Sequence, residues 1–129
     1  MTMDSDGNFG IGTTTPAYKL EVNGTLGCTS ITETSSIRYK ENVRDLTDTV
    51  IPSLRPVIYD RKDGSVRDEV GLIAEEVSQI IPEVVKFDTL GREDGINYTR
   101  LIPYLIDHIQ KLEKRVEELE NGNPDLSDV

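Results

Sequence analysis

The hydrophobic pattern divides the chain into three zones, and the first zone runs to about Glu33. Here apolar and polar residues alternate in short stretches, as at Phe9 and Ile11 and again at Leu20 and Val22. Alternation with a period of two predicts short strands, and the Gly, Asn and Pro residues between them predict tight turns. So few apolar side chains cannot form a core. We expect these strands to interleave with other chains; the alternative is a disordered leader.

The second zone, from Ser35 to about Tyr98, mixes helical and strand patterns. Four apolar residues spaced by three or four positions predict a helix that stops before Pro56. Those residues are Val43, Leu46, Val50 and Leu54. The following stretches predict a strand in PVIYDR, a turn at 63–65, a strand leading into a short helix that ends before Pro82, and a further hairpin. The predicted fold class is α+β.

The third zone, from Thr99 to about Glu120, carries a heptad pattern. Its a and d positions, spaced alternately by three and four residues, are Ile102, Leu105, Ile109, Leu112, Val116 and Leu119. This spacing predicts a coiled-coil seam, and the opposite charges of Arg115 and Glu120 suit a parallel assembly. The alternative is an amphipathic helix that packs on its own domain. After the heptads, Gly122 and Pro124 predict a flexible tail.

Composition narrows the function classes. The chain has 129 residues, 36% of them hydrophobic, and a mean hydropathy of −0.40, which gives a thin core for a monomer and predicts an oligomer. Its 24 acidic and 14 basic residues argue against binding nucleic acid or an anionic membrane. A lone cysteine, Cys28, and a lone histidine, His108, exclude an internal disulfide and a His-rich metal site. We expect no metal and no cofactor.

The sequence also bears on compartment. It contains no apolar run of the roughly 18 residues that a membrane span needs, and its start lacks the basic-then-apolar order of a signal peptide. We therefore expect a soluble protein made in a cytoplasm.

A serine and a lysine lie five residues apart in the stretch SSIRYKEN, which runs from Ser35 to Asn42. The ordinary interpretation is a turn residue beside a solvated lysine. The functional interpretation is that a neutral Lys40 amine takes the proton of the Ser35 hydroxyl, as a histidine does in other hydrolases. A lysine amine has an ordinary pKa near 10.4, so it must be buried, or lie near other cations, to be neutral. In so small a chain, burial requires neighbouring subunits.

Several segments, in matching order, resemble one family: the C-terminal intramolecular chaperone domains of phage tailspikes, tail fibres and endosialidases, which are self-cleaving S74-type peptidases. SSIRYKEN is similar to the family's opening Ser-Asp-x-Arg-x-Lys followed by an acidic or polar residue and Asn. Later segments also resemble the family: PVIYDR, EVGLIAEEVSQIIPEVV and INYTRLIPYLIDHIQKLEKRVEELE. GNFGIGTTTPAYKLEVNGTL is similar to a β repeat that precedes the domain in phage fibres. Because the chain opens within that repeat, we expect a longer parent protein.

The resemblance implies roles for individual residues. Ser35 would be the nucleophile, Lys40 its general base, and the bond between Thr34 and Ser35 the scissile bond. This chain has Ser36 where the family usually has Asp, so help from that carboxylate is absent and cleavage is expected to be slower or lost. Ser36 also leaves the scissile bond ambiguous by one residue, although the five-residue spacing to Lys40 favours Ser35. The motif residues with a supporting role would be Ser36, Arg38 and Asn42.

These observations predict four parts: the end of a fibre β repeat (1–34), an α+β chaperone domain (35–98), a coiled-coil helix (99–120) and a tail (121–129). Model coiled coils with β-branched a residues and Leu at d favour two strands, whereas the resemblance implies three. We expect three, because interleaved fibre strands upstream would set the number.

The predicted function is an intramolecular chaperone that trimerises, registers an upstream tail fibre or tailspike, and releases itself by cleavage between Thr34 and Ser35. Its partners would be copies of itself and the upstream region, and its location the virion tail after assembly in the host cytoplasm. The alternative is an uncleaved structural tip of a trimeric viral fibre that contacts a host surface receptor.

Overall fold

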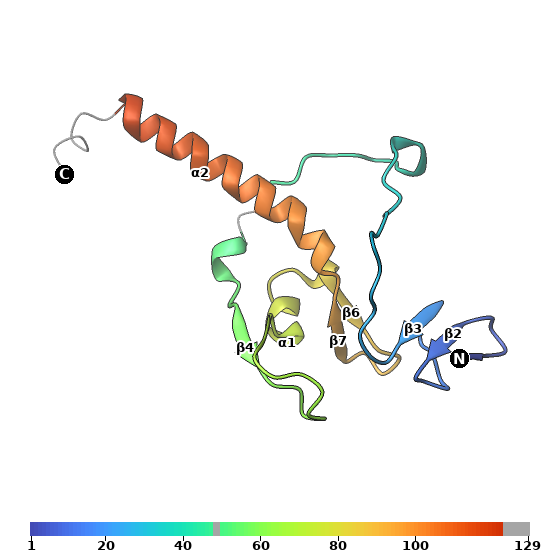
Figure 1. Cartoon of the computed structure of the whole chain (residues 1–129). Helices are drawn as coiled ribbons and strands as arrows, with labels where there is room; N and C mark the ends of the chain where they lie inside the picture. The colour runs from blue at the N-terminus through green and yellow to red at the C-terminus, as the bar shows by residue number, and fades with distance from the viewer. Residues whose placement is uncertain (48–49, 123–129) are drawn as a thin grey trace. The chain divides into compact units, whose positions relative to one another are not determined.

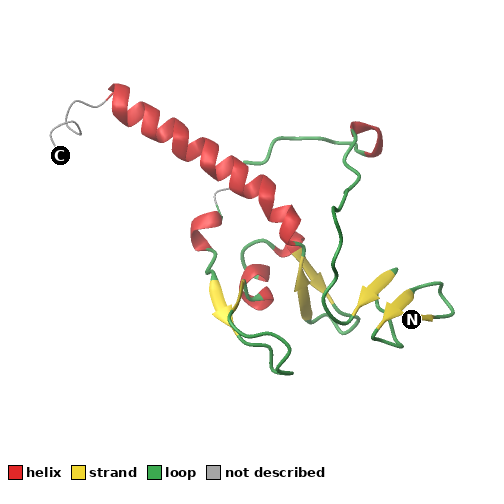
Figure 2. Cartoon of the chain, in the orientation of Figure 1, coloured by secondary structure: helices red, strands yellow, loops and turns green. Residues whose placement is uncertain are grey.

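The computed structural model describes residues 1–47 and 50–122. These divide into two compact units, Met1–Val43 and Arg44–Val129, of which the second is described as far as residue 122. Short strands and helices alternate along the chain, and one long helix ends it (Figure 1 and Figure 2). The predicted α+β class is confirmed.

The first unit contains a small three-stranded sheet of β1 (Thr2–Met3), β2 (Phe9–Ile11) and β3 (Leu20–Val22). Strand β1 pairs antiparallel with β2, and β2 pairs parallel with β3 within the same chain. The strands at Phe9–Ile11 and Leu20–Val22 lie where the alternation predicts them. Phe9, Ile11 and Leu20 remain 41–56% exposed. Interleaving with other chains stays a prediction.

After the sheet the first unit continues without regular structure to a single 3₁₀ turn, η1 (Ile37–Tyr39). Gly10 and Pro16 are buried in the first unit, but no described side chain from this unit belongs to the buried hydrophobic cluster.

The second unit begins with a 3₁₀ turn and continues as two hairpins joined by a short helix. Its elements are η2 (Ile51–Ser53), β4 (Val57–Tyr59), β5 (Glu69–Gly71), α1 (Ala74–Ser78), η3 (Pro82–Val84), β6 (Val85–Phe87), β7 (Glu93–Ile96), η4 (Tyr98–Leu101) and α2 (Ile102–Gly122). Strands β4 and β5 pair antiparallel, as do β6 and β7. Strands β4, β5 and β6, helix α1 and the long helix lie where the pattern predicts them. The pattern predicts the second strand of the last hairpin at 96–98, after a turn at 90–95, but β7 forms at Glu93–Ile96.

One predicted element is wrong. The apolar stripe that begins at Val43 predicts a helix, but the described residues on either side of Asp48 and Thr49 form none beyond the three-residue turn η2. Asp48 and Thr49 themselves lie outside the described residues. Pro52 explains the difference, because it lacks a backbone N–H and so ends any helix that would run through it from the N-terminal side. It sits instead in the first turn of η2, where no donor is required.

The core of the second unit forms around the short helix. Five side chains are buried: Val77, Ile81, Val84, Val85 and Leu101. Seven further apolar residues pack around them: Val50, Leu54, Leu72, Ala74, Ile80, Ile96 and Tyr104. Helix α1 thus packs on the β6–β7 hairpin, and the first residues of the long helix close the cluster.

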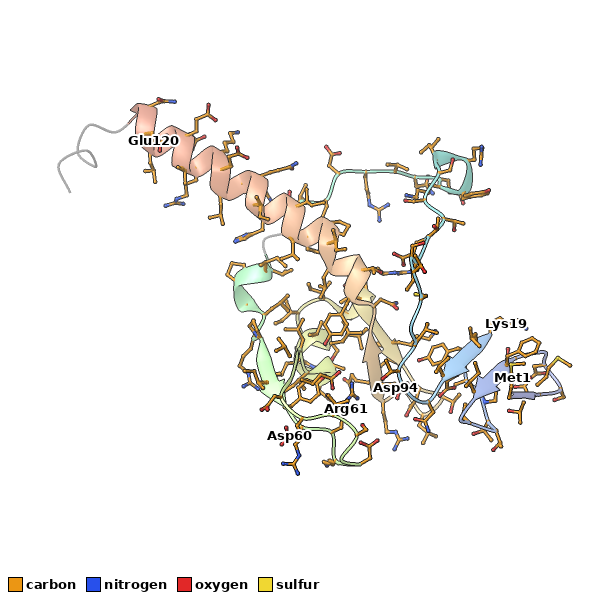
Figure 3. The ribbon with its side chains drawn as sticks, in the orientation of Figure 1. Met1, Lys19, Asp60, Arg61, Asp94 and Glu120 are labelled. Atoms are coloured by element: carbon orange, nitrogen blue, oxygen red, sulfur yellow. The ribbon has the colours of Figure 1, made fainter. Side chains whose placement is uncertain are left out.

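The long helix α2 leaves this core after its first turns. Every residue from 109 to 122 is exposed, and Figure 3 shows side chains projecting on all sides of the helix up to Glu120. Pro103 lies in the first turn, as its missing N–H requires. The six seam residues Ile102, Leu105, Ile109, Leu112, Val116 and Leu119 are 39–59% exposed. The single chain therefore leaves the seam uncovered, and the trimeric coiled coil stays a prediction.

None of the helices within residues 1–47 and 50–122 is long and apolar enough to cross a membrane.

Candidate functional site

The SSIRYKEN motif folds as a single tight turn. Ser36 precedes η1 with extended backbone angles (φ −66°, ψ 144°), and its hydroxyl oxygen accepts a hydrogen bond from the N–H of Arg38 at 3.3 Å. The carbonyl of Ser36 accepts the N–H of Tyr39 at 3.0 Å, and that of Ile37 accepts the N–H of Lys40 at 3.1 Å. Ser36 is thus the N-cap of the turn, and Lys40 is its C-cap.

The turn brings the two predicted catalytic side chains together. Lys40 Nζ donates a hydrogen bond to Ser35 Oγ at 2.7 Å. This distance is within the 2.6–3.2 Å range that proton transfer between a nucleophile and its base requires. Both residues are exposed in the single chain. Thr34, on the other side of the predicted scissile bond, is exposed and lies outside any helix or strand.

The other two supporting motif residues, Arg38 and Asn42, lie on either side of the lysine in the sequence. The guanidinium of Arg38 lies 5.5 Å from the centre of the Tyr39 ring, in a cation–π contact. Asn42 has a φ of +54°, in the left-handed region that asparagine tolerates better than most residues, and turns the backbone after the motif.

Exposed apolar side chains surround this turn. Ile37, Tyr39 and Val43 are each 68–69% exposed. Apolar groups next to a polar site exclude water once another surface covers them, and in the single chain no described surface does so. The contact between Ser35 and Lys40 is therefore present in the single chain, whereas the water-excluding surroundings that a neutral lysine needs are not.

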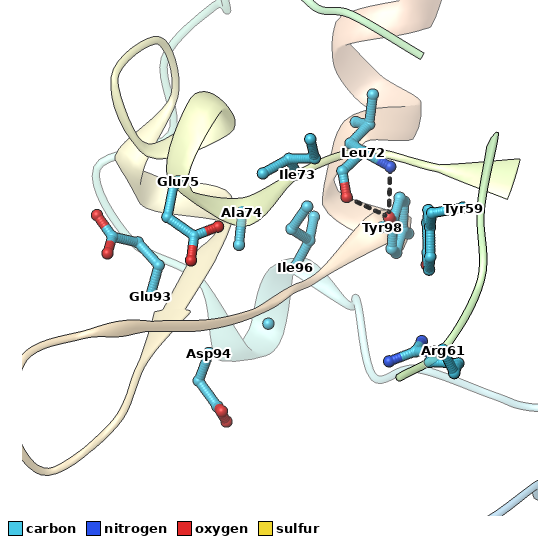
Figure 4. Close-up of a pocket in the computed structure, with 11 residues that line it drawn as sticks. Tyr59, Arg61, Leu72, Ile73, Ala74, Glu75, Glu93, Asp94, Ile96 and Tyr98 are labelled. Carbon is cyan, nitrogen blue, oxygen red and sulfur yellow. Dashed lines mark hydrogen bonds between the residues drawn. The ribbon is translucent and has the colours of Figure 1, made fainter. Parts of the chain in front are cut away.

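A second feature, in the other unit, was not predicted from the sequence. A pocket of about 310 Å³ lies between the β4–β5 hairpin, the start of α1 and strand β7 (Figure 4). The Tyr59 and Tyr98 rings line one side of it, and the carboxylates of Glu75, Glu93 and Asp94 lie around its other side. No local pattern points to this pocket, because its lining residues are up to 39 positions apart in the sequence, from Tyr59 to Tyr98, and come together only in the fold.

The tyrosines of this pocket are fixed by polar contacts. The N–H of Leu72 donates to the Tyr98 hydroxyl oxygen at 2.9 Å, and the Tyr98 hydroxyl lies 3.5 Å from the Leu72 carbonyl (Figure 4). Arg61 forms a two-pronged ion pair with Glu69 at 2.6 and 3.1 Å and lies 5.5 Å from the Tyr59 ring centre. Desolvation, followed by the negative charge of Glu69, raises the pKa of Tyr59. The Leu72–Tyr98 contact joins the end of the β4–β5 hairpin to η4, and the Arg61–Glu69 pair links the two sides of the hairpin.

The described residues hold no cluster of three or more His, Cys, Asp or Glu side chains that could bind a metal ion.

Comparison with known families agrees with the motif. A family model described as chaperone of endosialidase, Peptidase_S74, matches residues 35–86. The match begins at Ser35 and ends within β6, so it contains the SSIRYKEN turn, the β4–β5 hairpin and α1. This part of the chain is thus supported as an S74-type chaperone domain. The family indicates an intramolecular chaperone role and is consistent with self-cleaving peptidase activity. No curated protein matches the chain.

Proposed function

We propose that this protein is an intramolecular chaperone of a phage tail fibre or tailspike, which trimerises, registers the upstream chains, and then releases itself by cleavage between Thr34 and Ser35. The observation that carries the proposal is the 2.7 Å contact between Lys40 Nζ and Ser35 Oγ at the first residue of the family match. Its partners are two further copies and the upstream fibre region. The virion tail is its proposed location, after assembly in the host cytoplasm.

The proposed reaction uses the serine hydroxyl against its own peptide bond. Neutral Lys40 takes the proton of Ser35 Oγ, and the oxygen attacks the carbonyl carbon of Thr34 through a five-membered ring. The C–N bond then breaks, the Ser35 nitrogen receives the proton, and Thr34 is left as an ester on the Ser35 oxygen. Water hydrolyses that ester, which yields a Thr34 carboxylate and a free Ser35 amine and hydroxyl.

Assembly is proposed to switch the reaction on. An amine is a base only when neutral, and water stabilises its charged form. Lys40 is exposed in the single chain, but three exposed apolar side chains, Ile37, Tyr39 and Val43, flank it. Contacts between copies that cover these side chains would exclude water from the amine. Cleavage would then occur only in chains that have already assembled.

Trimerisation is proposed to use the uncovered seam of α2. Its six a and d residues are 39–59% exposed, and within its own unit the helix contacts η2 and η4 near its N-terminus. Burial of such a seam is the usual source of stability in a coiled coil. Within this proposal, residues 1–34 end the fibre repeat, 35–98 form the chaperone domain, 99–120 form the coiled coil and 121–129 form the tail.

Denaturing electrophoresis and intact-mass measurement test the cleavage. The wild-type chain should give two products, and N-terminal sequencing should find Ser35 at the start of the larger one. A larger product that starts at Ser36 would show that the scissile bond lies one residue further on and that Ser35 is not the nucleophile. Ser35→Ala should abolish the cut, whereas Ser30→Ala, a matched change upstream of the motif, should not. A single uncut band from wild-type trimers would instead favour the uncleaved fibre tip with a receptor contact.

The lysine is tested separately. Lys40→Ala should assemble normally and remain uncut, because the base is gone while the seam of α2 is unchanged. Lys62→Ala, which removes a lysine from the exposed hairpin loop, is the matched control and should cut as the wild type does. Cleavage by Lys40→Ala at the wild-type rate would contradict the proposed role of the lysine.

A further inference from the structure

The contact between Ser35 and Lys40 depends on the turn between them. Five residues of extended chain span about 17 Å, which is too far for the two polar atoms to meet unless the backbone folds back. The 3₁₀ turn η1 supplies that reversal, and Lys40 Nζ reaches Ser35 Oγ. Any residue that stabilises this turn therefore affects how often the pair is formed.

Helical turns this short are marginal by themselves. Nucleating one fixes several backbone angles in return for one or two hydrogen bonds, so an isolated turn is rarely populated in water. Here the described backbone bonds of the turn are those from Tyr39 N–H to Ser36 and from Lys40 N–H to Ile37. The hydroxyl of Ser36 adds a third by accepting the N–H of Arg38. Ser36 is also half-buried, whereas the residues on either side of it are exposed.

We propose that Ser36 is a positioning residue for the self-cleavage: its hydroxyl caps the turn that presents the Lys40 amine to the Ser35 hydroxyl. This proposal rests on the proposed function, which assigns the reaction to Ser35 and Lys40. Ser36 touches neither reacting atom in this role. It acts by raising the fraction of chains in which the pair is formed.

The hydrogen bond from the Arg38 N–H gives Ser36 a role that does not depend on a carboxylate. The family pattern has Asp here, and its replacement is expected above to weaken the site. Ser and Asp are, however, among the best N-cap residues, because either side chain can accept the N–H two residues on. The exchange therefore keeps the cap and removes only a charge.

The first test measures the rate of self-cleavage in the full chain. Ser36→Ala should slow the cut about twofold to tenfold, the range expected for the loss of an exposed cap. Ser36→Asn and Ser36→Asp should restore the rate to within about twofold of wild type, because both side chains cap well. Ser53→Ala, in the 3₁₀ turn η2, is the matched control and should leave the rate unchanged.

The pH dependence separates positioning from an electrostatic effect. A cap changes how many chains have the pair in place, so Ser36→Ala should lower the rate by the same factor at every pH and leave the midpoint of the profile where it is. A shifted midpoint in Ser36→Ala would overturn the positioning role. So would a Ser36→Ala chain that cuts as fast as the wild type, or one that Ser36→Asn fails to rescue.

A second measurement does not depend on cleavage. In the uncut Ser35→Ala background, ¹³Cα chemical shifts report whether Ile37–Tyr39 are helical. Adding Ser36→Ala should move these shifts towards random-coil values, and Ser36→Asn should retain them. Helical shifts that persist without the Ser36 hydroxyl would overturn the proposal. If instead the wild-type chain is never cut, the proposed function itself fails, and the positioning role fails with it.

Discussion

Removing two apolar side chains from the middle of the seam should separate the proposed trimer into single chains. The change is Ile109→Ser together with Leu112→Ser, one a position and one d position of the same heptad. Both side chains lie on α2 beyond the residues that pack on the core of its unit. The fold of the single chain should therefore survive the change while its association does not.

The expected cost follows from how much of each side chain the single chain leaves uncovered. Ile109 is 59% exposed and Leu112 is 49% exposed. Complete burial of such a side chain contributes about 1.5–3 kcal/mol, so covering the exposed half contributes about 1 kcal/mol. Two positions in three chains then give about 6 kcal/mol per trimer, a rise of about 10⁴-fold in the dissociation constant.

Sedimentation equilibrium between about 1 and 100 μM measures this change. The wild type should sediment as a trimer and the double variant as a monomer. The matched control is Lys114→Ser with Glu117→Ser, which places two serines on the same helix away from the seam and leaves the net charge unchanged. A control that dissociates equally would mean that helix propensity, not the seam, determines assembly.

The same double variant tests whether assembly switches on the chemistry. Ser35 and Lys40 are unchanged in it, so a site that needed only its own residues would still cut. We expect no cut, because the amine of an unassembled chain stays in water. Efficient cleavage by a chain that sediments as a monomer would refute this reasoning, and a monomeric wild type would refute the proposed trimer.

Two further predictions concern the second unit. A Cβ at Gly71 would lie 2.8 Å from the Tyr98 hydroxyl oxygen, so Gly71→Ala should break the hydrogen bond that this oxygen accepts from the Leu72 N–H and lower the free energy of unfolding by about 1–2 kcal/mol. Gly95→Ala is the control and should leave the stability unchanged, because the space around Gly95 is open. Equal urea midpoints for the two variants would contradict the prediction. The hydrogen bond from Arg61 lowers the pKa of Glu69 below its ordinary 4.5, so the stabilisation from the Arg61–Glu69 pair is present above pH 4.5 and is lost as the pH falls through the lowered value. Glu69→Gln should therefore reduce the loss of folding stability at acid pH. An unchanged loss of stability at acid pH in Glu69→Gln would contradict the prediction.

The elements of the second unit that the sequence predicts correctly are those with a strong local signal. Strands β4 (VIY) and β6 (VKF) carry apolar residues next to polar turns, so their strand pattern is clear, whereas β5 (EVG) and β7 (EDGI) form by pairing with them. The long helix has an uninterrupted heptad pattern and Pro103 in its first turn. In each case the local preference and the packing favour the same structure.

The mistaken helix before Pro56 shows where a hydrophobic stripe is insufficient. Its apolar spacing is helical, yet Val50 and Leu54 reach the core from loop and turn conformations. Burying the side chains of Val50 and Leu54 stabilises any backbone conformation that places them in the core, and Pro52 excludes the helical conformation. The pocket beside Tyr98 was missed for a different reason. Its Tyr98–Leu72 contact joins residues 26 positions apart, and such pairing follows from the fold and not from local pattern.

The candidate site contains features that depend on local sequence and one that depends on contacts beyond the motif. The contact between Ser35 and Lys40 spans the single turn η1, with Ser35 just before the N-cap and Lys40 as the C-cap, so the five-residue spacing is compatible with the contact but does not by itself establish it. The cap was missed because comparison with the family's Asp directs attention to charge, whereas Ser36 accepts the N–H of Arg38 and both Ser and Asp are good N-cap residues in general. What local sequence does not supply is the water exclusion that a neutral amine requires. Ile37 and Tyr39 are exposed within the motif itself. A chaperone that cut as soon as its turn formed would be released before registering anything, so in the proposed function the covering of this surface by assembled partners would make the cut report on assembly.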